Sequence, residues 1–172
     1  WRGAADAVSQ ATPMAMAKTQ GILTSSGDLL MGTFSGSVGE TFHLGIIVGG
    51  IFLMLTRVSN WRVPVSLLSS VFVFAFVGTI VGGLFGGGEE TKAFGALISQ
   101  AWSFSIFHLL AGSLLFGAMY MVTDPVTSPV TNEGKWIFGI LCGLLTLMIR
   151  VFSGYVEGVM FAIVIMNSVT PM

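Results

Sequence analysis

This chain of 172 residues has a net charge of only −1, and 53% of its residues are hydrophobic while 9% are charged. Its mean hydropathy of +0.88 excludes an ordinary soluble protein, in which about a quarter of the residues are charged, and its scattered basic residues argue against nucleic-acid binding. The single cysteine, Cys142, excludes an internal disulfide and any cysteine-ligated iron-sulfur cluster or zinc site built from this chain alone, so redox chemistry here would require an organic cofactor.

The N-terminal segment, residues 1–39, is rich in Gly, Ser, Thr and Ala and has no apolar run of membrane-spanning length. We predict that it lies outside the membrane. The chain opens at Trp1 without an initiator Met or signal peptide, which favours a start inside a longer protein. The first apolar run, 42–55, is short for a membrane span, and Glu40 and Thr41 are expected to extend its helix toward the interface.

Four further apolar runs follow, and they predict the rest of a membrane domain over residues 40–172. Residues 63–85 and 101–122 contain no Asp, Glu, Lys or Arg, so each is expected to form one continuous span of about 20 residues. Residues 136–152 form a fourth span if Arg150 extends its side chain to the interface, and a fifth begins near Gly158. The predicted fold class is an all-α, polytopic membrane helix bundle with about five transmembrane helices.

Five spans place the loops 57–62 and 123–135 on one side of the membrane. These two loops hold three basic residues, which places them in the cytoplasm by the positive-inside rule. Residues 1–39 would then face the opposite side.

A series of motifs resembles one known family along nearly the whole chain. The string from Asp6 to Met14 resembles the flavin attachment sequence of the RnfD and NqrB family of membrane subunits, in which a threonine is esterified to the phosphate of FMN, and Thr12 matches that threonine. Gln10 departs from the small residue usual in this string. Further matches follow in the same order as in the family: Gly36 to Thr41, Asn60 to Pro64, Thr123 to Pro129, Gly134 to Trp136, and Ile149 to Gly158 with Met166 and Asn167.

The resemblance implies both an architecture and a function. The family subunit has two related halves, and this chain resembles the second. We expect a multi-pass subunit of a bacterial inner (plasma) membrane, carrying FMN covalently on Thr12 and passing electrons between partner subunits of an Rnf or Nqr complex. Riboflavin at the interface with the other half is a further expected cofactor. The subunit is not expected to be active alone or to bind NAD, because no Gly-x-Gly-x-x-Gly turn is present.

The motifs are compatible with two branches of the family. The turn at 152–155, the Trp-Arg-Val-Pro string at 61–64 and the Thr-Ser-Pro at 127–129 look more like RnfD, which implies a ferredoxin:NAD oxidoreductase that translocates Na⁺ or H⁺. Gly-Lys-Trp at 134–136 is similar to NqrB, which implies an NADH:quinone oxidoreductase. A non-redox solute transporter or channel is an alternative of another class, because short, glycine-interrupted spans also build transporter sites.

Besides Thr12, four residues are candidates for cofactor binding, and none is a candidate catalytic residue or metal ligand. Gly39, Glu40 and Thr41 open an apolar helix, where backbone N–H groups can face a phosphate or a flavin edge; the alternative is an ordinary helix start with Thr41 or Ser37 as cap. Asp124 stands before Pro125 at the end of a span, where a carboxylate either serves an ion or flavin or simply ends the helix in a turn.

The remaining patterns have structural explanations. Glu157 and Arg150 flank one turn and are predicted to pair at the interface. His43 and His108 have no second ligand at helical spacing and are expected to bond across helices. Glycines recur three or four residues apart, which favours close helix packing: Gly45, Gly49 and Gly50; Gly78, Gly82 and Gly83; Gly139 and Gly143.

Overall fold

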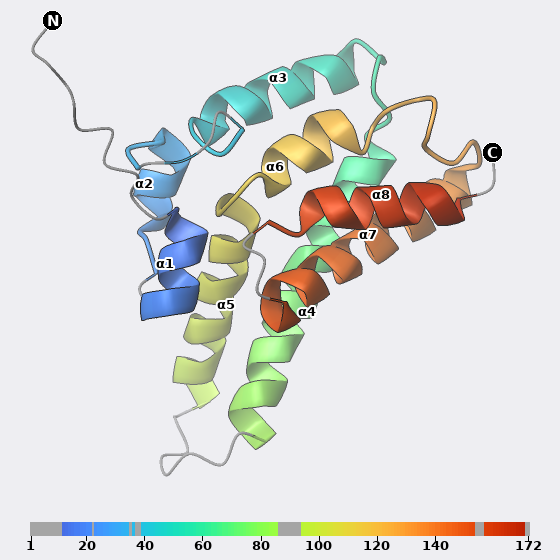
Figure 1. Ribbon diagram of the computed structural model, residues 1–172. Helices are drawn as coiled ribbons and strands as arrows, with labels where there is room; N and C mark the ends of the chain where they lie inside the picture. The colour runs from blue at the N-terminus through green and yellow to red at the C-terminus, as the bar shows by residue number, and fades with distance from the viewer. Residues whose placement is uncertain are drawn as a thin grey trace, which may run out of the picture.

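A computed structural model describes residues 12–21, 23–34, 36, 39–85, 94–153 and 157–170. Within these ranges the chain forms helices and no strand, which confirms the predicted all-α class. In chain order the helices are α1 (Pro13–Gln20), α2 (Ser26–Met31), α3 (His43–Leu55), α4 (Arg62–Phe85), α5 (Phe94–Leu110), α6 (Leu114–Phe116), the π-helix η1 (Gly117–Met121), α7 (Asn132–Phe152) and α8 (Val159–Val169) (Figure 1).

The packing of α4 against α7 forms the centre of the bundle. The two helices approach closely at two glycines, because a Cβ on Gly139 would lie 2.8 Å from the carbonyl oxygen of Val63 and one on Gly143 would lie 2.8 Å from that of Leu67. The predicted role of this glycine pair in helix packing is therefore confirmed. The core around this contact joins residues of α4, α6, η1, α7 and α8, with Val122 just after η1: Val63, Leu67, Val71, Leu114, Ala118, Val122, Phe138, Cys142, Val159, Ile163 and Met166.

Membrane-spanning length is reached by two helices of the described ranges. These are α4 and α7, and a third span results if α5 is counted together with α6 and η1. The helices α3 and α8, with 13 and 11 residues, are apolar but shorter than the roughly 20 residues that cross a bilayer. All five predicted apolar segments are thus helical, and the molecule is a membrane helix bundle, but fewer than five of its helices have full spanning length.

The predicted continuous span over residues 101–122 is wrong, because the chain breaks after α5 and resumes as α6 and η1 at an angle of 65°. At the break, Gly112 has a φ of +74°, a left-handed conformation that glycine adopts without steric cost. Beyond the break, the N–H of Val122 bonds to the carbonyl of Gly117 at 2.8 Å, the wider spacing of a π-helix. Apolar composition predicted a helix here, but gave no signal for its bend.

The N-terminal segment packs against the broken helix. Met14 of α1 and Leu29 of α2 are buried together with Phe107 and Ala111, at the end of α5. His43, the first residue of α3, adds a hydrogen-bonded contact, since its Nδ1 lies 2.6 Å from the carbonyl oxygen of Leu29. This confirms the predicted bond between helices for His43. Residues of the predicted extramembrane segment are therefore held at the bend.

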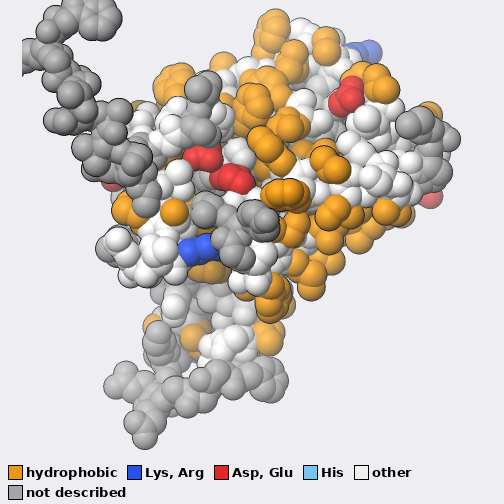
Figure 2. Space-filling model, viewed as in Figure 1, with side chains coloured by type: hydrophobic (Ala, Val, Ile, Leu, Met, Phe, Trp, Pro, Cys, Tyr) orange, Lys and Arg blue, Asp and Glu red, His pale blue; other side chains and the backbone are white. Residues whose placement is uncertain are grey.

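Much of the outer surface is apolar. Figure 2 shows hydrophobic side chains spread over the face on which α3 and α8 lie. The exposed apolar residues of these helices include Phe52 and Leu55 of α3 and Phe161 and Val164 of α8. Exposed apolar area of this extent is typical of a surface that contacts lipid or another subunit.

Candidate functional site

Thr12 stands at the N-terminus of α1 and caps that helix. Its backbone is extended, with φ −61° and ψ 155°, and its Oγ1 accepts a hydrogen bond of 3.4 Å from the N–H of Ala15. Pro13 follows at the first helical position, where its fixed φ suits a helix. The side chain of Thr12 is half-buried, and its oxygen is engaged in this hydrogen bond.

The three predicted residues before α3 lie in a turn and not in the helix. The helix begins at His43, and its N-cap residue is Phe42, without a side-chain cap. The prediction that Glu40 and Thr41 extend the helix is therefore wrong, as is Thr41 as its cap; Ser37 lies outside the described residues. The turn packs on α6, because a Cβ on Gly39 would lie 3.5 Å from the ring of Phe116.

Arg150 of α7 is buried, with only 1% of its surface exposed. The predicted extension of its side chain to the membrane interface is wrong. Its Nη1 donates to the carbonyl of His108 at 2.6 Å, and its Nη2 donates to that of Ala111 at 3.0 Å. The last carbonyl groups of a helix have no N–H partner within that helix. Because the chain bends after α5, no further helical turn provides N–H donors for them. The guanidinium satisfies these carbonyls instead.

Two carboxylates accompany this buried cation. Glu40, which is 5% exposed, and Glu157 both interact electrostatically with Arg150. Glu157 also accepts hydrogen bonds from the N–H and hydroxyl of Ser113, the residue before α6. We call Glu40, Arg150 and Glu157 the charge cluster. A buried charge is stable only when it is paired and hydrogen-bonded, so the cluster fixes both sides of the break. The predicted interaction of Glu157 with Arg150 is present, but in the interior.

A cavity of about 590 Å³ opens beside the charge cluster, between α1, α5 and the end of α7. We call it the α1 cavity. Lys18 stands at its rim and donates from Nζ to the carbonyl of Ser153 at 3.0 Å. Partial burial, and then the positive charge of Arg150, lower the pKa of Lys18. The described residues that line the cavity are Met14, Ala17, Lys18, Gly21, Leu23, Gln100, Phe104, Phe107, His108, Arg150, Val151 and Ser153.

Two polar atoms of this lining are buried without a hydrogen-bond partner in the structure. They are His108 Nδ1 and Arg150 Nε. The imidazole packs edge-on against Phe104, with 4.4 Å between ring centroids, so the cavity offers aromatic surface next to two unsatisfied nitrogens. An apolar pocket with a few convergent polar groups is typical of a cofactor site.

Asp124 lies elsewhere in the molecule. It belongs to the loop between η1 and α7, which is far from α1 in Figure 1. Its Oδ1 accepts from the N–H of Val126 and its Oδ2 from the hydroxyl of Thr127, both at 3.2 Å. The carboxylate therefore stabilises its own turn, the structural alternative considered for it. No group of three or more His, Cys, Asp and Glu in the described ranges is placed to hold a metal ion.

Sequence reasoning missed the convergence of His108, Arg150 and Lys18 on one cavity. His108 and Arg150 were assigned separately, and Lys18 was given no role. His108 was expected to bond across helices, and the structure uses its backbone carbonyl for that purpose. The only local signal is the Ala-Gly-Ser string at 111–113 inside an apolar run. Glycine alone is tolerated in membrane helices, so this signal is weak.

Comparison with known proteins gives a match along the whole chain. A family model described as the NQR2, RnfD, RnfE family matches residues 1–172. The chain is 37% identical to a subunit of the proton-translocating ferredoxin:NAD(+) oxidoreductase complex of Clostridium ljungdahlii, over 97% of this chain and 49% of that protein. It is 34% identical to a subunit of the Na(+)-translocating NADH-quinone reductase of Azotobacter vinelandii, over 98% of this chain and 41% of that protein.

A third relative has a ferredoxin:NAD(+) oxidoreductase name like the first, but with Na(+) in place of the proton. It is a subunit of the Na(+)-translocating ferredoxin:NAD(+) oxidoreductase complex of Acetobacterium woodii, 33% identical over 97% of this chain and 46% of that protein. The chain therefore spans about half the length of the curated relatives it matches, in keeping with the predicted likeness to one half of a longer subunit.

Proposed function

Because this chain belongs to the NQR2, RnfD, RnfE family, we propose that it is the flavin-carrying half of a membrane subunit in a complex that couples electron transfer to ion movement. Its attachment residue is Thr12, to which the phosphate of FMN is joined as an ester. The observation that carries the proposal is the position of Thr12 as cap of α1, next to the α1 cavity.

The N-terminus of α1 suits a phosphoester. The first N–H groups of a helix have no partners within it and carry the positive end of the helix dipole. A phosphate on Thr12 Oγ1 would stand at this end, where the N–H groups of Met14 and Ala15 are the nearest backbone donors, because Pro13 has none. The local structure therefore favours the charge that the modification adds.

The α1 cavity fits the ring of such a cofactor. Its volume of about 590 Å³ lies in the range of roughly 300–1,000 Å³ usual for cofactor pockets. Lys18 is six residues from Thr12, about 9 Å along the helix, so the cavity is within reach of a group tethered at the cap. His108 and Arg150, whose Nδ1 and Nε have no hydrogen-bond partner in the structure, contribute polar groups to its lining.

These positions indicate separate roles for the flavin and for the protein. Flavin supplies the capacity to accept and pass on electrons. The protein binds the phosphate at α1, excludes water with the aromatic lining of α5, and sets the electrostatic potential with Lys18 and Arg150. Donor and acceptor chemistry would belong to the other subunits of the complex, which are the proposed partners together with membrane lipid, in a bacterial inner membrane.

Within the family, we propose the Rnf branch, a ferredoxin:NAD oxidoreductase. The relative from Clostridium ljungdahlii has this activity in its name and is 37% identical. The Nqr branch is the second candidate, since the Azotobacter vinelandii relative is 34% identical. The assembled complex separates the two branches, because ferredoxin reduces NAD⁺ in one and NADH reduces quinone in the other.

Mass spectrometry of the full-length subunit tests the flavin proposal. The subunit is expressed with the family's flavin-attaching enzyme as wild type, Thr12→Ala, Thr12→Ser and Thr19→Ala, in which Thr19 is a matched, exposed threonine of the same helix. We expect an FMN-sized adduct on the peptide containing Thr12 in the wild type and Thr19→Ala, and none in Thr12→Ala. A wild type without flavin, or an adduct that persists in Thr12→Ala, would contradict the proposal and favour a non-redox transporter or another attachment residue.

A further inference from the structure

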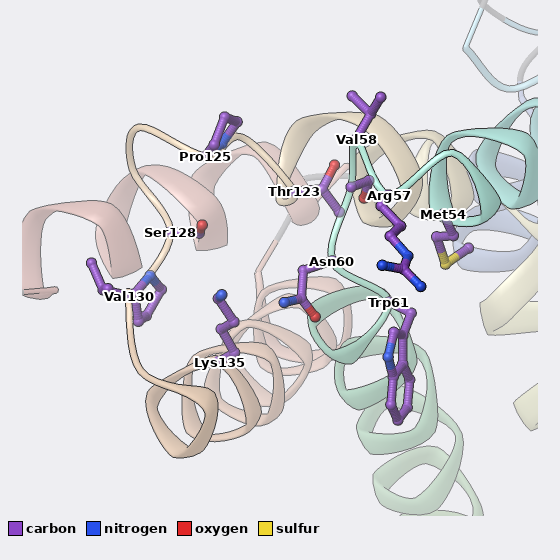
Figure 3. A pocket seen from close by; sticks show the side chains of 12 residues that line it. Met54, Arg57, Val58, Asn60, Trp61, Thr123, Pro125, Ser128, Val130 and Lys135 are labelled. Atoms are coloured by element: carbon purple, nitrogen blue, oxygen red, sulfur yellow. The ribbon is translucent and has the colours of Figure 1, made fainter.

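A second cavity, of about 540 Å³, lies between the loop joining α3 to α4 and the loop joining η1 to α7. We call it the loop cavity. These are the two loops predicted to share one side of the membrane, and they meet here (Figure 3). The described residues that line it are Met54, Arg57, Val58, Ser59, Asn60, Trp61, Thr123, Pro125, Ser128, Pro129, Val130 and Lys135.

The charges on this lining are all positive. Arg57 and Lys135 are its two ionic side chains, and no Asp or Glu is present among the described lining residues. The nearest carboxylate in sequence, that of Asp124, is occupied by hydrogen bonds within its own turn. Because Arg57 follows α3 and Lys135 lies in the first turn of α7, their proximity to one cavity results from the fold and not from a run of basic sequence.

Neutral donors accompany the cations. The oxygen of the Asn60 amide accepts from the N–H of Arg62 at 3.1 Å, and Figure 3 shows the nitrogen end of this amide directed toward Lys135. A lining of ammonium, guanidinium and amide N–H groups can donate hydrogen bonds but offers few acceptors. Such a set recognises an oxyanion.

Ser59 provides an independent indication of a missing ligand. It is 8% exposed, and its buried Oγ has no hydrogen-bond partner in the structure. Its backbone is fixed, since its N–H bonds to the carbonyl of Leu53 at 3.2 Å. A buried hydroxyl without a partner is unfavourable, and an oxyanion in the cavity that Ser59 lines would provide an acceptor.

The helix arrangement adds to the positive potential. Both α4 and α7 begin at this end of the bundle, and they are joined by a hydrogen bond from Arg62 Nη1 to Asn132 Oδ1. Two helix N-termini therefore direct their positive dipole ends toward the same region. Trp61 and Trp136 pack edge to face here, with centroids 6.2 Å apart, and tryptophan is enriched at the membrane interface.

We propose that the loop cavity binds a phosphate-bearing anion. The chemistry is that of a tetrahedral oxyanion held by Arg57 and Lys135 from two sides, with Ser59 and Asn60 as neutral donors. Such a group is supplied either by the headgroup of an anionic phospholipid at the interface or by a soluble phosphate or phosphate ester. The site is remote from α1, so it does not depend on the flavin on Thr12.

The test uses the full-length subunit in its assembled complex. One arm reconstitutes the complex in nanodiscs that mix phosphatidylglycerol with phosphatidylcholine and measures by native mass spectrometry which phospholipids stay bound. The other arm measures binding of inorganic phosphate by isothermal titration calorimetry, in nanodiscs of phosphatidylcholine alone. The proteins compared are the wild type, the neutral double variant Arg57→Gln with Lys135→Gln, the charge-preserving double variant Arg57→Lys with Lys135→Arg, and Ser59→Ala.

We expect the neutral double variant to bind its ligand at least about tenfold more weakly than the wild type, since charge-assisted hydrogen bonds are lost. The charge-preserving variant should retain most of the binding, and Ser59→Ala should show a smaller loss. Retention of phosphatidylglycerol alone identifies a lipid headgroup, whereas phosphate binding identifies a soluble ligand. A wild type that shows neither, or a correctly assembled neutral variant that binds as well as the wild type, overturns the proposal. If the neutral variant does not assemble, the comparison of Ser59→Ala with the wild type is the test: weaker binding by Ser59→Ala supports the proposal, and equal binding overturns it.

Discussion

The guanidinium of Arg150 donates a 3.0 Å hydrogen bond to the carbonyl oxygen of Ala111, the first residue beyond the end of α5. One side chain of α7 thereby completes the end of a different helix, across 39 positions of sequence. Because the same guanidinium interacts with Glu40 and Glu157, the broken helix, α7 and the turn before α3 are held by one buried cation.

Replacing this cation should destabilise the bundle. In Arg150→Met, the carbonyls of His108 and Ala111 lose their donor and two carboxylates lose their opposite charge, which typically costs about 3–5 kcal/mol. Arg150→Lys keeps the positive charge, so it should lose less stability than Arg150→Met. It should still be less stable than the wild type, because an ammonium group lacks the planar fork that donates to both carbonyls. Thermal unfolding of the full-length subunit in detergent measures both, and equal stability of Arg150→Met and the wild type would contradict this role.

The bend itself should be intolerant of a side chain at Gly112. A Cβ there would lie 2.5 Å from Oε1 of Glu157 and 3.0 Å from Nη2 of Arg150, and the left-handed backbone adds about 1–2 kcal/mol for a residue other than glycine. We expect Gly112→Ala to lower the melting temperature by several degrees. Gly82→Ala is the matched control, because nothing lies within 4 Å of its Cβ position; this change in a helix interior should be neutral or stabilising.

The sequence predicted the helices that form from local apolar runs, but not the bend that depends on distant contacts. Long apolar runs with a helix-compatible start predicted α4 and α7, because burial in lipid requires a helix whatever the details of the sequence. The bend at Gly112 depends on contacts with Arg150 and Glu157, which are distant in sequence. The Ala-Gly-Ser string at 111–113 is only a weak local signal of it. The buried Arg150 was missed for the same reason, since an arginine near a helix end ordinarily reaches water.

The candidate site was likewise only partly predictable from local sequence. Resemblance to the family predicted Thr12, and the structure places it at a helix cap, which neither composition nor periodicity indicated. Gly39, Glu40 and Thr41 were grouped by sequence as one phosphate-facing helix start, but Glu40 instead belongs to the charge cluster. Glycine spacing correctly predicted close packing at Gly139 and Gly143, but not at Gly78 and Gly82, where nothing lies within 4 Å of the Cβ position. Spacing alone does not reveal which face of a helix has a neighbour.

The contact between α4 and α7 should fail when Gly143 acquires a methyl group. A Cβ there would overlap the Oγ of Ser70 and lie 2.8 Å from the carbonyl oxygen of Leu67. Backbone atoms cannot move aside without separating the helices, and overpacking of this kind costs about 1–3 kcal/mol. Gly143→Ala should therefore lower the thermal stability of the full-length subunit in detergent, whereas Gly82→Ala should not. If both variants melt like the wild type, the helices are not held at this distance.

The electrostatics of the α1 cavity give a prediction that rests on the proposed flavin. Reduced flavin carries more negative charge than oxidised flavin, so a nearby cation favours reduction. Removing the charge of Lys18 in Lys18→Gln should lower the midpoint potential of the bound flavin. A charge interaction of about 1 kcal/mol at a solvated site corresponds to about 20 mV for a two-electron couple. Lys18→Arg keeps the charge and should leave the potential within a few millivolts of the wild type.

The pH dependence provides a second readout of the same residue. The pKa of Lys18 is lowered, first by burial and then by the positive charge of Arg150, so its charge is lost at a lower pH than that of an ordinary lysine. As pH rises through this lowered pKa, the midpoint potential of the wild type should fall toward that of Lys18→Gln, and the two should converge. Redox titration of the purified, flavin-loaded complex at a series of alkaline pH values measures the convergence. A constant difference across the whole range would mean that Lys18 acts on the flavin through structure and not through its charge.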